Sequence, residues 1–372
     1  MSKNRDYGVD LLRSCLMLMI ILGHIFTHTG IRNDLAFLSG KWIFTWTAQA
    51  MTICAVDCFV IITGYYMSQT KYKINRLLRL WGKVIVYSVG ITLVLAVLDV
   101  IELDIKTLLD SVFPVFRNEY WFFTVYILLY LLIPFINVGI GNMPYGMHFV
   151  LVVIITAFFY IEPLFSAVFY EYDGSEGFSI IAFITLYIIG SFLARCKDIK
   201  RKWCVVILSA STSIMLASKI ALCLITDKLN LGFGTSLFYH YNSIFVLMNA
   251  VAVFELFKQI TYADTIKKLF AMISPSVFSV YLLHEKPAIR KILWNVALRN
   301  YLLQISCLKY MICVIGISIA IFCGCILVDK LLEFTAFNRI NKYIDFAGEK
   351  IELLSGTMSR RIQNMIQKET QH

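Results

Sequence analysis

The amino-acid sequence predicts an all-α protein, a polytopic bundle of about ten transmembrane helices. Of its 372 residues, 59% are hydrophobic and 16% are charged, and the mean hydropathy is +0.73. Water-soluble domains have about 45–50% apolar and about 25% charged residues. Apolar runs of about 20 residues, long enough to cross a hydrocarbon core of about 30 Å, recur along the chain. The runs are continuous rather than alternating, which indicates helices and not barrel strands.

We place the spans at roughly 9–30, 43–67, 83–101, 121–138, 148–165, 179–196, 203–225, 242–258, 275–295 and 307–328. With the N-terminus inside, most of the 34 Lys and Arg residues fall in cytoplasmic segments, as the positive-inside rule requires. An even number of spans then puts both termini in the cytoplasm. Residues 1–328 are predicted to form a transmembrane domain and residues 329–372 a cytoplasmic helical tail.

The inner-leaflet bias of basic residues accounts for most of the net charge of +10, so this charge predicts contact with membrane lipid and not with nucleic acid. The ten cysteines lie mostly inside apolar runs, and their spacing fits neither a zinc site nor a disulfide framework. We therefore expect no metal. The sequence leaves open whether the protein forms a homo-oligomer.

The first span carries an arginine and a histidine, Arg13 and His24, with almost only apolar residues between them. At about 100° and 1.5 Å per residue, the histidine returns to nearly the same helix face about 16 Å further along. An ionisable residue inside a span indicates a functional site. Arg13 taken alone fits equally well a side chain that reaches the inner surface and sets the topology.

The second span carries Asp57, which inside a membrane must be paired or protonated. A carboxylate that accepts a hydrogen bond from one nitrogen of an imidazole makes the other nitrogen more basic. We therefore predict that Asp57 pairs with His24 at a functional site. A structural ion pair between Asp57 and Arg13 is the alternative.

Arg76 and Arg79 follow this span at i and i+3, a spacing that suits phosphate oxygens. An ordinary positive-inside loop would also explain them. A second group of residues lies toward the outer face and is predicted to bind a polar acceptor: Arg117, Glu119, Tyr120, Trp121, His284 and Glu285. The aromatic pair could instead belong to an interfacial belt. Packing alone does not explain Lys219, inside the seventh span.

Several of these motifs, in this order, resemble the acyltransferase-3 family of integral membrane proteins that O-acetylate bacterial surface polysaccharides. They are the arginine and histidine of the first span, Asp57-Cys-Phe with Thr63-Gly-Tyr, the pair Arg76 and Arg79, Trp121-Phe-Phe-Thr with Tyr126, Tyr130 and Pro134, and Tyr281-Leu-Leu-His284. The likeness runs from the N-terminus to the tenth span. Thr63 departs from it, because serine is usual there.

The resemblance implies a multi-pass enzyme of the bacterial cytoplasmic membrane. It would transfer an acyl group from a cytoplasmic acyl-CoA, with acetyl-CoA as the expected donor. The acceptor would be a hydroxyl of a cell-surface or exported glycan or glycolipid. The catalytic residues would be His24, as a base or a nucleophile, and Asp57, which would orient it. Arg13, Arg76 and Arg79 would hold the donor or orient the site. A single-domain member is implied.

Either role of His24 needs a neutral imidazole, so activity should fall as the pH drops and the ring is protonated. Two other readings remain open at the level of sequence. A proton-coupled transporter or flippase of a glycan or anionic substrate would use intramembrane His and Asp residues as a relay, but no repeat of two halves is visible. A membrane module without chemistry of its own is the other.

Overall fold

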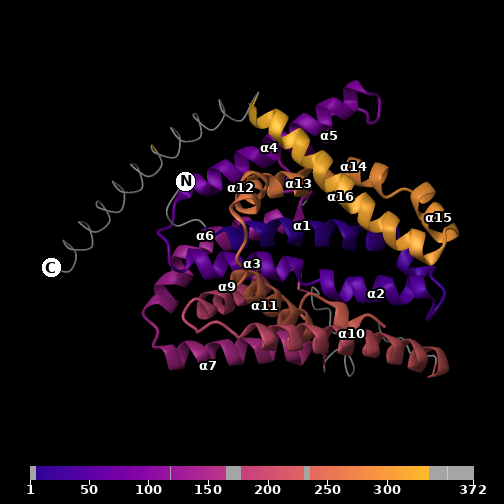
Figure 1. The fold of residues 1–372 in the computed structure, drawn as a ribbon. Helices are drawn as coiled ribbons and strands as arrows, with labels where there is room; N and C mark the ends of the chain where they lie inside the picture. The colour runs from indigo at the N-terminus through magenta and orange to yellow at the C-terminus, as the bar shows by residue number, and fades with distance from the viewer. Residues whose placement is uncertain (1–5, 118, 165–176, 230–234, 335–349, 351–372) are drawn as a thin grey trace. The chain divides into compact units, whose positions relative to one another are not determined.

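The computed structural model describes residues 6–117, 119–164, 177–229, 235–334 and 350, and these contain helices and no strand (Figure 1). The α-helices are α1 Tyr7–His28, α2 Gly40–Thr52, α3 Ala55–Met67, α4 Ile74–Val97, α5 Ile105–Val112, α6 Trp121–Gly141, α7 Tyr145–Thr156, α9 Ile180–Leu193, α10 Arg201–Leu229, α11 Ile244–Lys258, α12 Asp264–Ile273, α13 Val277–His284, α14 Pro287–Leu293, α15 Val296–Gln304 and α16 Cys307–Leu332. The predicted all-α class is confirmed.

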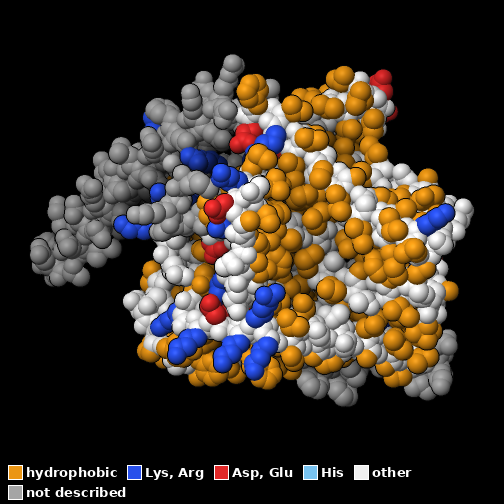
Figure 2. All heavy atoms as spheres, viewed as in Figure 1, with side chains coloured by type: hydrophobic (Ala, Val, Ile, Leu, Met, Phe, Trp, Pro, Cys, Tyr) orange, Lys and Arg blue, Asp and Glu red, His pale blue; other side chains and the backbone are white. Residues whose placement is uncertain are grey.

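Within the described residues, nine helical segments are long and apolar enough to cross a membrane. They are Tyr7–His28, Gly40–Met67, Ile74–Val97, Trp121–Gly141, Tyr145–Leu164, Arg201–Thr226, Leu237–Lys258, Asp264–His284 and Cys307–Leu332. Helix α9 is apolar but shorter. Large hydrophobic side chains are exposed on α7, α10 and α16, and Figure 2 shows them over much of the face it presents. The chain is a multi-pass membrane protein.

Three predicted spans differ from the helices in ways that matter for the site. The second is divided at residues 53–54 into α2 and α3, so Asp57 lies in the first turn of a helix. The third begins at Ile74, earlier than predicted, because no proline interrupts the helix between residues 74 and 83. Arg76 and Arg79 lie on its first turns. The ninth ends at His284, because Pro287 starts a new helix after a turn.

The described chain falls into two compact units. The first comprises Met1–Thr70 and Tyr120–Ile326, and the second comprises Lys71–Glu119 and Leu327–His372. In the second unit, Lys83 Nζ forms an ion pair with Asp329 Oδ1 at 3.1 Å, and the Tyr87 hydroxyl donates to the same carboxylate at 2.6 Å. Residues 335–349 and 351–372 of the predicted tail lie outside the described residues.

The core of the first unit is built on α3, which packs along α9 and α11 (Figure 1). The α3–α9 contact is close because a glycine lies on each side. A Cβ on Gly64 would come within 2.2 Å of the Tyr187 carbonyl oxygen, and one on Gly190 within 2.3 Å of the Ile61 carbonyl oxygen. Helix α1 contacts α2, α3, α11, α12 and α13. Side chains of α1 can therefore reach residues near the other end of the sequence.

Candidate active site

Helix α1 positions two histidines one turn apart. It begins at an N-cap, where the Asp6 side chain accepts hydrogen bonds from the backbone of Gly8 and Val9, and it continues without a break to His28. His24 and His28 are i and i+4 on one face, and their ring centroids are 4.6 Å apart. Continuity of the helix also preserves the spacing from Arg13 to His24 that the sequence predicts.

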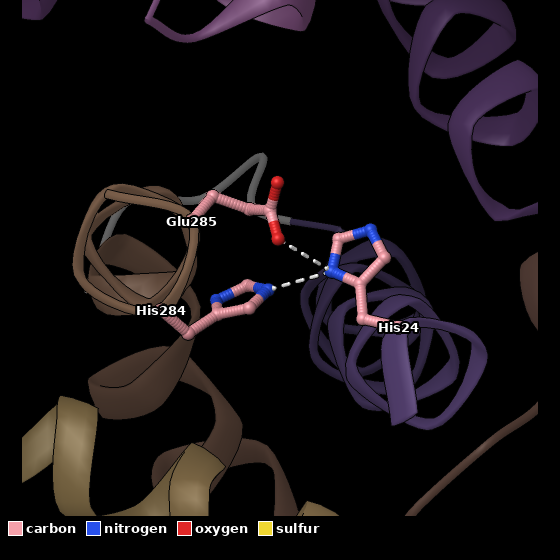
Figure 3. Close-up of side chains that lie close together, drawn as sticks. All are labelled: His24, His284 and Glu285. Carbon is pink, nitrogen blue, oxygen red and sulfur yellow. Dashed lines mark hydrogen bonds and ion pairs between the residues drawn. The ribbon is translucent and has the colours of Figure 1, made fainter. Parts of the chain in front are cut away.

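The C-terminal end of α13 brings a third histidine and a carboxylate to this face (Figure 3). His24 Nδ1 lies 3.2 Å from His284 Nε2 and 3.0 Å from Glu285 Oε1. His28 Nε2 lies 3.0 Å from the same Glu285 oxygen. The other carboxylate oxygen of Glu285 is 3.5 Å from Arg290 Nη1, on α14. The turn that separates α13 from α14 thus supplies the acid of the cluster.

The hydrogen bonds fix the tautomer of His24. His284 Nδ1 is 2.5 Å from the carbonyl oxygen of Val280, which can only accept, so the proton of a neutral His284 is on Nδ1 and Nε2 is an acceptor. His24 Nδ1 then faces two acceptors, His284 Nε2 and Glu285 Oε1, and must carry the hydrogen. In neutral His24 the lone pair is consequently on Nε2. That nitrogen points away from both partners in Figure 3.

Burial and charge support this arrangement. The His284 residue has no exposed surface, and the Glu285 side chain is 6% exposed. Burial alone would raise the pKa of Glu285, but the neighbouring His24 and His28 outweigh it and hold that pKa well below its usual range. The carboxylate is therefore charged, and it stabilises positive charge on the histidines beside it.

A cavity of about 430 Å³ opens beside the cluster, and its walls come from the first unit. The lining residues are Met19, Ile20, Gly23, His24, Thr27, His28, Arg32, Gln49, Thr52, Ile53, Val56, Trp121, Phe178, Ser236, Tyr239, His240, Tyr241, Glu285 and Arg290. The Trp121 and Phe178 rings meet edge to face at 4.6 Å, and Trp121 is 6.0 Å from the Tyr241 ring. The Gln49 Oε1 atom is buried without a hydrogen-bond partner. Aromatic faces and an unsatisfied amide suit a polar ligand.

Among the residues predicted to bind the acceptor, Trp121 and Glu285 line this cavity. His284 lies behind it, and Tyr120 is buried with its hydroxyl donating to the Leu282 carbonyl at 3.1 Å. The remaining two belong to the second unit. Arg117 Nε pairs with Asp110 Oδ1 at 2.5 Å, and Glu119 accepts a hydrogen bond from Ser88. The spatial cluster thus combines part of the predicted acceptor group with His24.

Asp57 was predicted as the partner of His24, but Glu285 occupies that place. Asp57 is 2% exposed, its Oδ2 has no hydrogen-bond partner, and no described hydrogen bond or ion pair joins it to His24. Asp57 lies in the first turn of α3, just after the break between α2 and α3. The expected orienting contact is supplied from α13 instead.

The predicted donor residues lie elsewhere. Arg13 lines a second cavity of about 350 Å³ with Asp6, Asp10 and Tyr66. Arg76 and Arg79 are exposed on the first turns of α4, in the second unit. Sequence reasoning did not single out three residues at the site, His28, Arg290 and Gln49. Of these, only His28 carried a signal, because it follows His24 at helical spacing.

His24, His284 and Glu285 offer three ligand atoms within 4.8 Å of one another, a set that could hold a metal ion. Ligands of one tetrahedral zinc, each about 2.0–2.1 Å from the metal, lie about 3.3 Å apart. The contacts of 3.0 and 3.2 Å at His24 Nδ1 are shorter and have the length of hydrogen bonds. As it stands, the cluster is a hydrogen-bonded relay between side chains.

The fold and the cluster define a class, a multi-pass helical membrane protein with a histidine and carboxylate site beside a cavity. Comparison with protein families narrows this class: the chain belongs to the acyltransferase-3 family, whose acyltransferase domain matches residues 6–330. No curated protein and no solved structure matches the chain. The protein is a membrane acyltransferase, and the family resemblance predicted from the sequence is confirmed.

Proposed function

We propose that the protein transfers an acyl group, namely acetyl, from cytoplasmic acyl-CoA to a hydroxyl of a cell-surface or exported glycan. One observation carries the proposal: His24 lines the cavity, and its neighbours leave the lone pair on Nε2. A neutral imidazole with a carboxylate on its opposite nitrogen is the group that general-base catalysis of acyl transfer needs. Membership of the family supports the acyl transfer itself.

The chemistry follows from this tautomer. His24 Nε2 takes the proton of the acceptor hydroxyl, and the oxygen attacks the thioester carbonyl of the donor. The C–S bond then breaks, and the proton passes from His24 to the departing thiolate of coenzyme A. Glu285 stabilises the positive charge that His24 carries between these steps. Attack of Nε2 itself on the thioester, with an acyl-histidine intermediate, would use the same lone pair.

The acceptor would occupy the cavity, between the aromatic wall at Trp121 and the Gln49 amide. Gln49 Oε1 is buried without a partner and would accept a hydrogen bond from a sugar hydroxyl. Coenzyme A carries its phosphates at the far end of a long arm from the thioester. Arg13 and His24 lie on nearly the same face of one helix, about 16 Å apart, a distance suitable for orienting such an arm.

The proposal is tested by incubating the purified protein with radiolabelled acetyl-CoA and candidate glycans. We expect His24→Gln to abolish label transfer, because the amide cannot take the proton. His148→Gln is the matched control, since His148 is a buried histidine that bonds Ser191 and Arg195 outside the cavity. Equal transfer by wild type and His24→Gln would contradict the mechanism. Movement of a glycan across vesicles without consumption of acetyl-CoA would contradict the function.

A second measurement separates the two roles of His24. Without acceptor, labelled acetyl-CoA should leave no label on the protein if the histidine acts as a base. Label that stays on wild type and is absent from His24→Gln would show that an acyl-histidine forms.

A further inference from the structure

Lys219 is a buried cation whose described partners carry no negative charge. It lies in the candidate span Arg201–Thr226 and is 5% exposed. Its Nζ donates to Thr235 Oγ1 at 2.7 Å and to Ser236 Oγ at 3.1 Å, and it lies 3.8 Å from the centre of the Trp46 ring. Among the carboxylates that the structure describes, none pairs with it. A buried charge without a counter-ion is costly, and inside a membrane such a residue is usually functional.

A second cation lies over the same indole. The Arg32 guanidinium carbon is 5.8 Å from the centre of the Trp46 ring, and Arg32 lines the cavity beside His24. Attraction to the aromatic ring offsets only part of the cost of bringing two like charges together. An anion on the cavity side would supply the counter-ion that Lys219 lacks among the described carboxylates.

Ser236 connects the buried ammonium to the cavity. A lysine ammonium has no acceptor, so Ser236 Oγ must accept from Lys219, and the serine hydroxyl hydrogen remains available as a donor. Ser236 lines the cavity, whereas Lys219 lies behind it. No described group accepts that hydrogen. The serine hydroxyl, polarised by the hydrogen bond that it accepts from the lysine, can therefore donate its own hydrogen to a ligand.

The other charges of the cavity favour the same sign of ligand. Glu285 is the one carboxylate among the described lining residues, and both of its oxygens already face His24, His28 or Arg290. Arg290 and Arg32 both line the walls. Among the described lining residues, the cationic side chains outnumber the single carboxylate.

We propose that the acceptor bound in this cavity carries an anionic group, a carboxylate or a phosphate, that is held by Arg32 and the Ser236 hydroxyl with Lys219 behind them. The inference rests on the proposed function in taking the cavity as the acceptor site. Arg32 and Ser236 would contact the anion, and Lys219 would act on it through Ser236. The acceptor class is then an acidic sugar or a sugar phosphate and not a neutral sugar.

The test is direct binding to the purified full-length protein in a neutral detergent, without donor. The probes are glucose, glucuronic acid and glucose 1-phosphate, with inorganic phosphate and potassium chloride at matched ionic strength. We expect at least one anionic sugar to bind roughly tenfold or more tightly than glucose, as one charge-assisted hydrogen bond provides. The two anionic probes distinguish a carboxylate from a phosphate. Equal binding of all three sugars would overturn the inference.

Two substitutions locate the anion. Arg32→Gln and Lys219→Met should each weaken binding of the anionic sugar roughly tenfold and leave glucose binding unchanged, whereas Lys219→Arg should retain most of the affinity. Lys258→Met is the matched control: Lys258 is also a buried lysine beside an aromatic ring, but it pairs with Asp198 and Glu255 at 2.8 Å. Anion affinity that is unchanged in both cavity variants would overturn the assignment.

Thermal denaturation without ligand gives an independent readout. Removing an unpaired buried charge should leave the midpoint of Lys219→Met unchanged or raised, whereas breaking the ion pairs of Lys258 should lower it. A midpoint lowered as far in Lys219→Met as in Lys258→Met would contradict the proposal, because Lys219 would then behave as an ion-paired lysine does. Efficient acetyl transfer to glucose alone would refute the anionic acceptor and preserve the proposed function. Selective anion binding without any acyl transfer would support the anionic ligand and contradict the proposed function.

Discussion

Replacing Glu285 by glutamine removes the negative charge beside His24 and keeps the size of the side chain. Glu285 Oε1 faces His24 Nδ1 and His28 Nε2, each at 3.0 Å. A hydrogen bond to a charged group contributes about 1.5–3 kcal/mol. If the bond to His24 acts fully in the transition state, where the imidazole is positive, its loss lowers kcat by about 10- to 150-fold, since 1.36 kcal/mol is a factor of ten. KM for the donor should change little.

The assay is steady-state release of coenzyme A in the presence of acceptor, measured from low to neutral pH. Glu255→Gln is the matched control, because Glu255 is 1% exposed and ion-paired with Lys258 but does not line the cavity. Its kcat should stay within about twofold of wild type, as expected for a site outside the reaction. A Glu285→Gln enzyme as active as wild type, or an equal loss in both variants, would refute the role of Glu285.

Three further outcomes are expected. Wild-type activity should fall as the pH is lowered, because base or nucleophilic catalysis needs a neutral imidazole; activity that stays constant down to low pH would speak against it. Gly64→Ala should lower thermal stability by about 1–3 kcal/mol or more, because its Cβ would overlap the Tyr187 carbonyl, whereas Gly139→Ala, with open space around it, should not. Treatment with EDTA should leave activity unchanged. If activity is instead lost and added zinc restores it, the cluster binds metal.

Local pattern determined the features that depend on neighbouring residues. Hydrophobic runs require helices in lipid, because backbone groups there must be satisfied within the segment. The spacing of Arg13 and His24 places them along one helix, since α1 runs unbroken between them. The ordered motifs also predicted the family that the comparison confirms. The helix ends were less well predicted where a break falls inside an apolar run, as at residues 53–54.

Which carboxylate meets His24 was decided by tertiary structure alone. Asp57 and Glu285 are both acids near apolar spans, and the sequence gives no measure of distance between helices. His24 and His284 are 260 positions apart, and they meet because α1 packs against α13. Asp57 lies in the first turn of α3, and Glu285 caps α13 shortly before Pro287 begins α14. Packing between distant segments follows from the whole set of buried surfaces, which no single motif contains.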